Sequence, residues 1–256
     1  MKIATWNVNS LKVRLPHLLQ WLETNPVDVL CLQETKLEDE KFPLAEINAA
    51  GYQVAFSGQK TYNGVAILST HPITDVVRNN PRFEDPQQRI LAATIEGMRF
   101  ISAYVPNGQA VDSDKYVYKL AWLASLREWL AEEMRTHGEQ GLAILGDYNI
   151  APEDRDVYDP VGWGDEVLCS PKEREALSHL IGLGLTDSFR MFEQPEKSFS
   201  WWDYRQLGYQ KNKGLRIDHI LLSESLAKRC VACAIDRVPR KWTQPSDHAP
   251  VIATLG

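Results

Sequence analysis

The chain has 256 residues, of which 44% are hydrophobic and 24% charged, with a formal net charge of −6 at pH 7. These values suit one ordinary globular domain, taken here as residues 1–256, and no apolar run approaches the ~18 residues of a membrane span. The start, MKIATWNVN, lacks the pattern of a secretory signal, and four scattered cysteines exclude a disulfide framework, so we expect a reducing, cytoplasmic setting. The acidic balance by itself argues against a polyanionic partner.

The predicted secondary structure contains more strands than helices. In chain order, short apolar runs predict strands at 2–6, 27–32, 52–56, 65–68, 90–95, 100–105, 142–145, 217–222 and 251–255. Helical spacing of apolar residues predicts helices over 11–22, with Ser10 as the N-cap, over 115–134 and over 173–181. Because several strands follow one another without a helix, the pattern favours two packed sheets with helices outside over a doubly wound parallel sheet.

Polar side chains lie at one end of six predicted strands. They are Asn7, Glu34, Tyr104, Asn107, Asp147, Asn149, Asp218, Asp247 and His248. Since neighbouring strand ends lie ~5 Å apart, residues distant in sequence can converge on one cleft. Oxygen donors with one imidazole, and no Cys/His pairs at zinc spacing, suit Mg²⁺ or Mn²⁺. Such a site is fit for hydrolysing a phosphate ester.

Each motif also has a structural explanation when it is taken alone. GDYN after a strand is typical of a turn, Glu34 of a solvated strand end and Tyr104 of a core position. An Asp-His dipeptide is in itself most often structural. Asp218 differs, because a carboxylate inside an apolar run needs a partner, for which His248 is suited.

In combination and in this order, the motifs resemble those of the exonuclease III-type abasic-site endonucleases of DNA base-excision repair, within the endonuclease/exonuclease/phosphatase superfamily. The matching stretches are WNVNSLKVR (6–14), LQETK (32–36), NGVAI (63–67), YVPNG (104–108), GDYNIAP (146–152), SWWDYR (200–205), GLRIDHIL (214–221) and PSDHAPV (245–251). They span the whole chain. The resemblance implies a four-layered α/β sandwich, in which two mixed β-sheets pack face to face with helices on the outside.

The resemblance also implies roles for the matching residues. It places the metal site at Asn7 and Glu34, with Asp147, Asn149, Asp247 and His248 around it. It gives Asp147 and Asn149 the attacking water and the scissile phosphate, lets Tyr104 reach the phosphate, and pairs Asp218 with His248. Asn9 departs from the pattern, since some relatives place an acid there.

Two residues are candidates for the general base. A phosphate and Asp218 would both raise the pKa of His248, and a histidine held charged is a poor base but stabilises a phosphorane well. We therefore expect Asp147 to take a proton from water, helped by Asn149, while His248 stabilises the phosphate. His248 as the base is the alternative.

The segment 197–216, KSFSWWDYRQLGYQKNKGLR, interleaves five Lys/Arg with five aromatic residues. This composition suits phosphate contacts and stacking on bases, although a solvated loop shares it. By resemblance, Trp201, Leu215 and Ile217 wall the pocket of an extrahelical, baseless sugar, and the loop 157–170 lies near it. Asn107 is a further DNA-binding candidate, and phosphate contacts are expected from Lys36, Lys60, Arg89, Lys115 and Lys119.

The leading hypothesis is a Mg²⁺-dependent phosphodiesterase that nicks duplex DNA 5′ to abasic sites. It also predicts removal of 3′-blocking groups, 3′→5′ exonuclease activity and a monomer that acts on double-stranded DNA. One alternative is a superfamily phosphatase acting on inositol phosphates or phospholipids, and another is a catalytically silent DNA-binding protein. The segment 197–216 and the GLRID stretch favour DNA over the inositol alternative.

Overall fold

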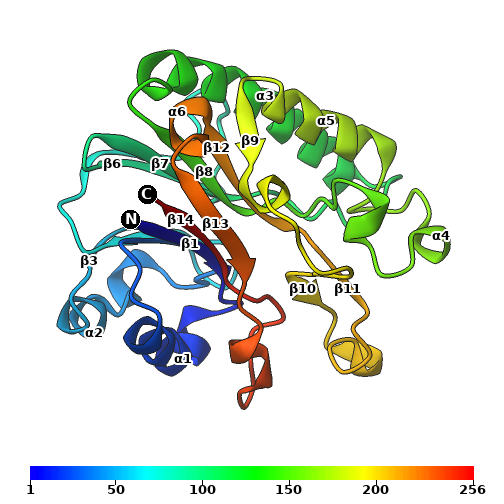
Figure 1. Cartoon of the computed structure of the whole chain (residues 1–256), viewed down its shortest axis with the longest axis horizontal. Helices are drawn as coiled ribbons and strands as arrows, with labels where there is room; N and C mark the ends of the chain where they lie inside the picture. The colour runs from blue at the N-terminus through cyan, green and yellow to red at the C-terminus, as the bar shows by residue number, and fades with distance from the viewer.

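The chain folds into four layers, seen here in a computed structural model that describes residues 1–256. Two six-stranded sheets lie face to face, and helices cover their outer faces (Figure 1). The predicted sandwich is therefore confirmed. None of the helices combines the length and the apolar character that a membrane crossing requires.

The first sheet joins both ends of the chain. Its strand order is β13-β14-β1-β2-β4-β3, and only the neighbours β1 and β2 run parallel. The strands are β1 (Lys2–Asn7), β2 (Val29–Gln33), β3 (Gln53–Ser57), β4 (Val65–Ser69), β13 (Cys230–Ile235) and β14 (Val251–Leu255). The two termini consequently lie side by side (Figure 1), and the Met1 ammonium donates to the Leu255 carbonyl oxygen at 2.7 Å.

The second sheet has the order β5-β6-β7-β8-β12-β9, in which β7 and β8 run parallel and the other neighbours antiparallel. The strands are β5 (Thr74–Arg78), β6 (Ile90–Ile95), β7 (Met98–Tyr104), β8 (Leu142–Asp147), β9 (Leu185–Asp187) and β12 (Asp218–Ser223). A separate ribbon of β10 (Trp201–Trp202) and β11 (Gly214–Leu215) lies beside the two sheets (Figure 1).

Helices cover both outer faces of the sandwich. On the face of the first sheet lie α1 (Leu11–Thr24) and α2 (Leu44–Ala49), and on the second lie α3 (Asp114–His137) and α5 (Pro171–Ile181) (Figure 1). The short helices are α4 (Pro160–Trp163) and α6 (Glu224–Ala227), with 3₁₀ turns η1 (Asp39–Lys41), η2 (Asp154–Asp156), η3 (Ser188–Met191), η4 (Arg205–Leu207) and η5 (Val238–Lys241). Apolar clusters fill the space between the sheets and under each helical layer.

Ser10 is the N-cap residue of α1, as predicted, but its side chain does not cap the helix. This residue has a φ of 85° and its side chain makes no capping hydrogen bond. Its main-chain N–H instead donates to the carbonyl oxygen of Glu34 at 2.8 Å. This contact ties the loop after β1 to the loop after β2, and both loops carry predicted site residues.

Candidate active site

Five strands bring their polar ends to one rim of the sandwich. Asn7 ends β1 and pairs in register with Gln33, the last residue of β2, so that Glu34 follows directly. Tyr104 ends β7 opposite Asp147, the last residue of β8. Because β12 runs antiparallel to β8, its first residue, Asp218, lies opposite Asp147 at the same rim.

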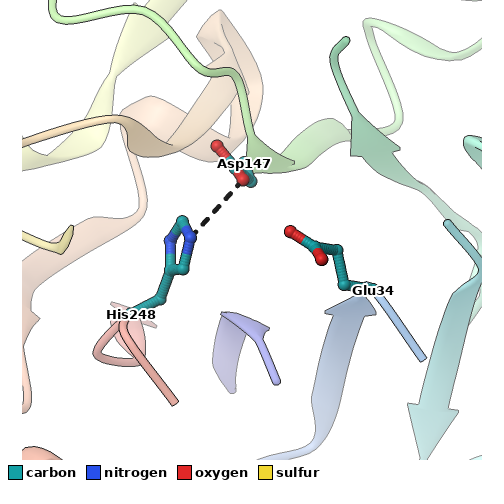
Figure 2. A group of neighbouring side chains, drawn as sticks. All are labelled: Glu34, Asp147 and His248. Carbon is teal, nitrogen blue, oxygen red and sulfur yellow. Dashed lines mark ion pairs between the residues drawn. The ribbon is translucent and has the colours of Figure 1, made fainter. Parts of the chain in front are cut away.

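The rim gathers Glu34, Asp147 and His248, whose ligand atoms all lie within 4.8 Å of one another. Figure 2 shows the three side chains converging from separate segments of the chain. The Nε2 atom of His248 lies 3.7 Å from Oδ2 of Asp147. Three residues that are far apart in the sequence thus lie close together at the rim, as predicted.

Side-chain amides hold the two carboxylates in place. Asn7 Nδ2 donates to Glu34 Oε1 and to Asp147 Oδ2, at 2.9 Å in both cases. The main-chain N–H of Asn149 donates to Asp147 Oδ1 at 2.9 Å. Asn107 Nδ2 in turn donates to Asn149 Oδ1 at 3.2 Å. One amide network therefore spans the loops after β1, β7 and β8.

Asp218 and His248 form a buried pair, as predicted. The Nδ1 atom of His248 lies 2.9 Å and 3.1 Å from the two oxygens of Asp218. Ser200 Oγ donates to Asp218 Oδ2 at 2.7 Å and accepts the main-chain N–H of Asp218 at 3.0 Å. The Ser246 hydroxyl fixes the PSDHAP turn, because it donates to the Asn7 carbonyl oxygen at 2.7 Å and accepts the His248 N–H at 3.2 Å.

These surroundings set the charges of the site. Burial lowers the pKa of His248, but the charges of Asp218 and Asp147 outweigh it and raise the pKa to about 10. Burial, reinforced by Asp218, raises the pKa of Asp147 to about 7. At neutral pH the imidazole is therefore charged.

Tyr104 completes the charge pattern of the rim. Burial, with the nearby charges of Glu34 and Asp147, raises the pKa of its phenol well above the ordinary value of 10. The guanidinium of Arg89 lies 4.8 Å from the centre of the Tyr104 ring. The phenol is therefore a neutral hydrogen-bond donor at the edge of the site.

Asp247 lies apart from the three converging ligands. Its Oδ1 accepts from Asn9 Nδ2 at 2.9 Å, and its Oδ2 accepts from Trp201 Nε1 at 3.0 Å. Asn9 Oδ1 accepts from Lys36 Nζ at 2.6 Å, and this ammonium also lies 2.8 Å from Glu34 Oε2. The side chain of Asn9 thus links Asp247, in the turn before β14, to Lys36, in the loop after β2.

The backbone is left-handed at several of these positions. Asn9, Glu34, Lys36 and Asn149 have φ angles of 43°, 53°, 53° and 50°. Residues other than glycine adopt such angles at a cost that the surrounding structure must offset, and they concentrate at functional sites.

The predicted DNA contacts divide by exposure. Asn107, Lys60 and Lys115 are exposed, and Lys36 and Arg89 are partly exposed. The prediction for Lys119 is wrong, because its side chain is fully buried and points inward.

The three residues predicted to line the sugar pocket differ in how deeply they are buried. Leu215 and Ile217 are buried in an apolar cluster beneath the partly buried Trp163, Val167 and Trp201. Of this group, only those three residues keep part of their side chains exposed. Within 197–216, four cations are exposed, whereas Arg216 is buried.

Sequence reasoning missed the network around Arg216. Its guanidinium lies 2.7 Å from Asp156 Oδ1, 2.8 Å from Asp187 Oδ2 and 3.0 Å from His219 Nδ1. His219 Nε2 lies 2.8 Å from the Ile150 carbonyl oxygen. The network joins the segment after Asp147 to the residues on both sides of Asp218. An arginine between the apolar residues Leu215 and Ile217 was the one available signal.

The donor set fits a hard divalent cation. Glu34 and Asp147 offer carboxylate oxygens at close range, with amide groups and one imidazole around them. Two carboxylates held this close in a poorly solvated place repel each other, and a cation would relieve that repulsion. Carboxylate and amide oxygens, without thiolates, are the ligands that Mg²⁺ and Mn²⁺ prefer.

Comparison with known proteins agrees with this geometry. The model of the Endonuclease/Exonuclease/phosphatase family matches residues 4–248. The chain is 39% identical to exodeoxyribonuclease III of Haemophilus influenzae, covering 99% of both proteins. The chain superposes with a TM-score of 0.98 on the 3′ phosphatase NExo from Neisseria bound to a product DNA hairpin, at 47% identity and with 100% of this chain and 99% of that one covered. With an AP endonuclease from Archaeoglobus fulgidus the TM-score is 0.95 and the identity 39%, over 100% and 99% of the two chains. The chain therefore belongs to the endonuclease/exonuclease/phosphatase family, as an enzyme of the exodeoxyribonuclease III type.

Proposed function

We propose that this DNA repair nuclease hydrolyses the phosphodiester 5′ to abasic sites in duplex DNA and also removes 3′-phosphates and 3′-terminal nucleotides. The observation that carries the proposal is the convergence of Glu34, Asp147 and His248 within 4.8 Å, with Asp218 directly behind His248. The relatives support these reactions, because they include an exodeoxyribonuclease, a 3′ phosphatase and an AP endonuclease.

The proposed cofactor is Mg²⁺, with Mn²⁺ as a substitute. Glu34 and Asn7 would hold it, with Asp147, Asn149, Asp247 and His248 around it. When bound, the ion supplies a positive charge that offsets the charge developing on the phosphate and favours ionised water.

Asp147 is the proposed general base. A base works best when its pKa lies near the operating pH, and burial brings the pKa of Asp147 to about 7. Asn149 and Asn7 both hydrogen-bond its carboxylate and fix its orientation. In this role Asp147 accepts the proton of the attacking water while Asn149 helps to place that water against the phosphate.

His248 is the proposed stabiliser of the phosphate. Because the pKa of its ring is about 10, the imidazole carries its charge throughout the neutral range and cannot accept a proton there. A fixed cation aimed at the place where negative charge develops is worth about 10²–10³ in rate. The neutral phenol of Tyr104 and the exposed amide of Asn107 are further donors to the phosphate oxygens.

The proposed partner is double-stranded DNA with an abasic site or a blocked 3′ end, bound by a monomer. Lys60, Lys115 and the four exposed cations of 197–216 would contact backbone phosphates. The apolar surface of Trp163, Val167 and Trp201 would receive the baseless sugar, which leaves the stack at low cost. A cytoplasmic location is part of the proposal, supported by four free cysteines.

Two duplexes test the proposal together. One carries a single tetrahydrofuran site and the other a recessed 3′-phosphate, each incubated with purified protein in Mg²⁺ or in EDTA. We expect incision 5′ to the tetrahydrofuran and release of phosphate, both only with Mg²⁺. Cleavage of neither duplex, together with hydrolysis of inositol phosphates, would replace this function by the phosphatase alternative.

A further inference from the structure

A buried ammonium lies directly behind the catalytic rim. Lys119 is on α3, and both its side chain and that of its ion-pair partner Glu173 are 0% exposed. Lysine is almost never fully buried without a partner, because removing the charge from water is costly. The contacts of Lys119 show what this buried charge does.

The ammonium group uses each of its three hydrogens. Nζ donates to the carbonyl oxygen of Asn149 at 2.7 Å, to that of Asn107 at 3.1 Å, and to Glu173 Oε1. A lysine has three donors and no acceptor, so its hydrogen-bonding capacity is satisfied. Two of the three acceptors are main-chain oxygens of residues at the active site.

Those two carbonyl groups belong to the loops that carry the amides of the site. Asn149 has a φ of 50°, and the Lys119 ammonium holds the carbonyl of this left-handed residue. The side chains of Asn107 and Asn149 are hydrogen-bonded to each other, and the Asn149 N–H holds Asp147. A shift of either main chain would therefore displace the base and the phosphate-facing amides together.

Glu173 extends the connection to the segment beside the proposed sugar site. Its Oε1 accepts the N–H of Leu168 at 3.1 Å, and its Oε2 accepts both the N–H and the hydroxyl of Ser170, at 3.1 and 2.6 Å. Leu168 packs in the apolar cluster that Val167 and Trp163 cover. One buried ion pair thus joins the active-site amides to the wall of the sugar site.

We propose that Lys119 is a positioning residue for cleavage, which fixes the main chains of Asn107 and Asn149 and couples them through Glu173 to the segment 167–170. This inference rests on the proposed roles of the two asparagines. Stability alone gives a weak reason for such a pair, because apolar residues of similar volume usually stabilise a core as well or better. A misplacement of about 1 Å at reacting groups costs about 10²-fold in rate.

Three variants separate positioning from stability. Lys119→Met keeps the length of the side chain but removes the donors, and leaves Glu173 buried without its partner. Lys119→Met/Glu173→Gln removes both charges, so no unpaired charge remains to destabilise the fold. Arg99→Met is the matched control. Arg99 is a buried cation at the opposite end of β7 from Tyr104, and it pairs with the partly buried Glu133 of α3.

We expect Lys119→Met to lower the single-turnover cleavage rate at saturating DNA about 10²-fold, with unchanged DNA affinity in EDTA. The double variant should regain stability toward urea but stay as slow, because the carbonyl groups still lack their donor. Arg99→Met should lose stability and keep its rate. Recovery of the rate together with stability in the double variant, or an equally slow Arg99→Met, would overturn the proposal.

A second readout does not depend on activity. In protein labelled with ¹⁵N-asparagine, the side-chain amide signals of Asn107 and Asn149 should shift in the double variant and stay in place in Arg99→Met. Unshifted signals contradict the positioning role even if the wild-type protein cleaves DNA. A wild-type protein that cleaves neither test duplex contradicts the proposed function instead, while shifted signals would still support the structural link.

Discussion

Asp218 controls the charge of His248, so replacing it with asparagine should convert a permanently charged imidazole into one that titrates in the neutral range. Asp218→Asn keeps the shape of the side chain and an oxygen that can accept from His248 Nδ1. It removes the negative charge, which lies 2.9 Å from that nitrogen, and turns one acceptor oxygen into an NH2 donor. The neighbouring Asp147 carboxylate, 3.7 Å from Nε2, remains.

The magnitude follows from the balance of burial and charge at His248. Burial alone lowers its pKa, and the two aspartates raise it from 6.5 to about 10, which corresponds to roughly 5 kcal/mol in favour of the charged ring. Asp218 is the stronger of the two charges. Without it, burial regains weight, and we expect the pKa of His248 to fall to about 7 or below.

Two measurements report the charge of the His248 imidazole. In metal-free protein in EDTA, the ¹⁵N shifts of the imidazole should show a charged His248 up to pH 9 in the wild type and a neutral one at pH 8 in Asp218→Asn. Single-turnover cleavage by the variant should be about 10²–10³-fold slower at pH 8, with a smaller deficit relative to wild type at pH 6, where the ring regains its proton. Asp154→Asn, an exposed carboxylate, is the control and should change neither. Titration of wild-type His248 near pH 6.5 would refute the reasoning.

Three further predictions follow from the site and its support. Asp147→Asn should bind DNA normally in EDTA but cleave it several orders of magnitude more slowly in single turnover, and near-normal cleavage would remove Asp147 from the base role. Burial raises the pKa of Asp156, but Arg216 and Arg190 together outweigh it and lower the pKa. The contribution of Asp156 to stability is therefore present above its unfolded pKa and is lost as the pH falls through the lower folded value. In urea unfolding at pH 7, Asp156→Asn should therefore have a free energy of unfolding about 3–5 kcal/mol below that of wild type. Between pH 5 and 3 the variant should lose less of its stability than wild type does. An equally steep loss of stability in acid would contradict this role of Asp156. Affinity for an abasic duplex should fall steeply between about 50 and 200 mM salt, whereas salt-independent binding would exclude phosphate contacts as its source.

The inner strands could be predicted because burial on both faces leaves a continuous apolar run in the sequence. The strands at Ile90–Ile95 and Val251–Leu255 have the predicted bounds. The edge strands at Thr74–Arg78 and Cys230–Ile235 were missed, since one side of an edge strand faces water and its residues are mixed. Val231, for example, is 60% exposed. Exposure removes the apolar signal on which the prediction depends.

The acids and the histidine of the rim could be predicted for a related reason. Polar residues at the ends of buried strands stand out against their apolar neighbours, and Glu34, Asp147 and His248 lie close together as expected. The supports of the site could not be predicted in this way. Lys119 in KYVYKLAW has the sequence context of an exposed helix lysine, and Ser200 resembles any loop serine. Their partners are distant in sequence, so only the packing of α3 against the loops and of β10 against β12 defines what they do.

The proposed function requires one divalent ion at the rim of the sandwich, held by Glu34 and Asn7 with Asp147 beside it. Crystals of the protein soaked in Mn²⁺ and measured at an anomalous wavelength test it most directly. We expect a dominant anomalous peak at the carboxylate of Glu34, on the side that faces Asn7 and Asp147, and this peak should disappear in Glu34→Gln. A dominant peak elsewhere on the molecule, or a peak that persists unchanged in Glu34→Gln, would contradict it.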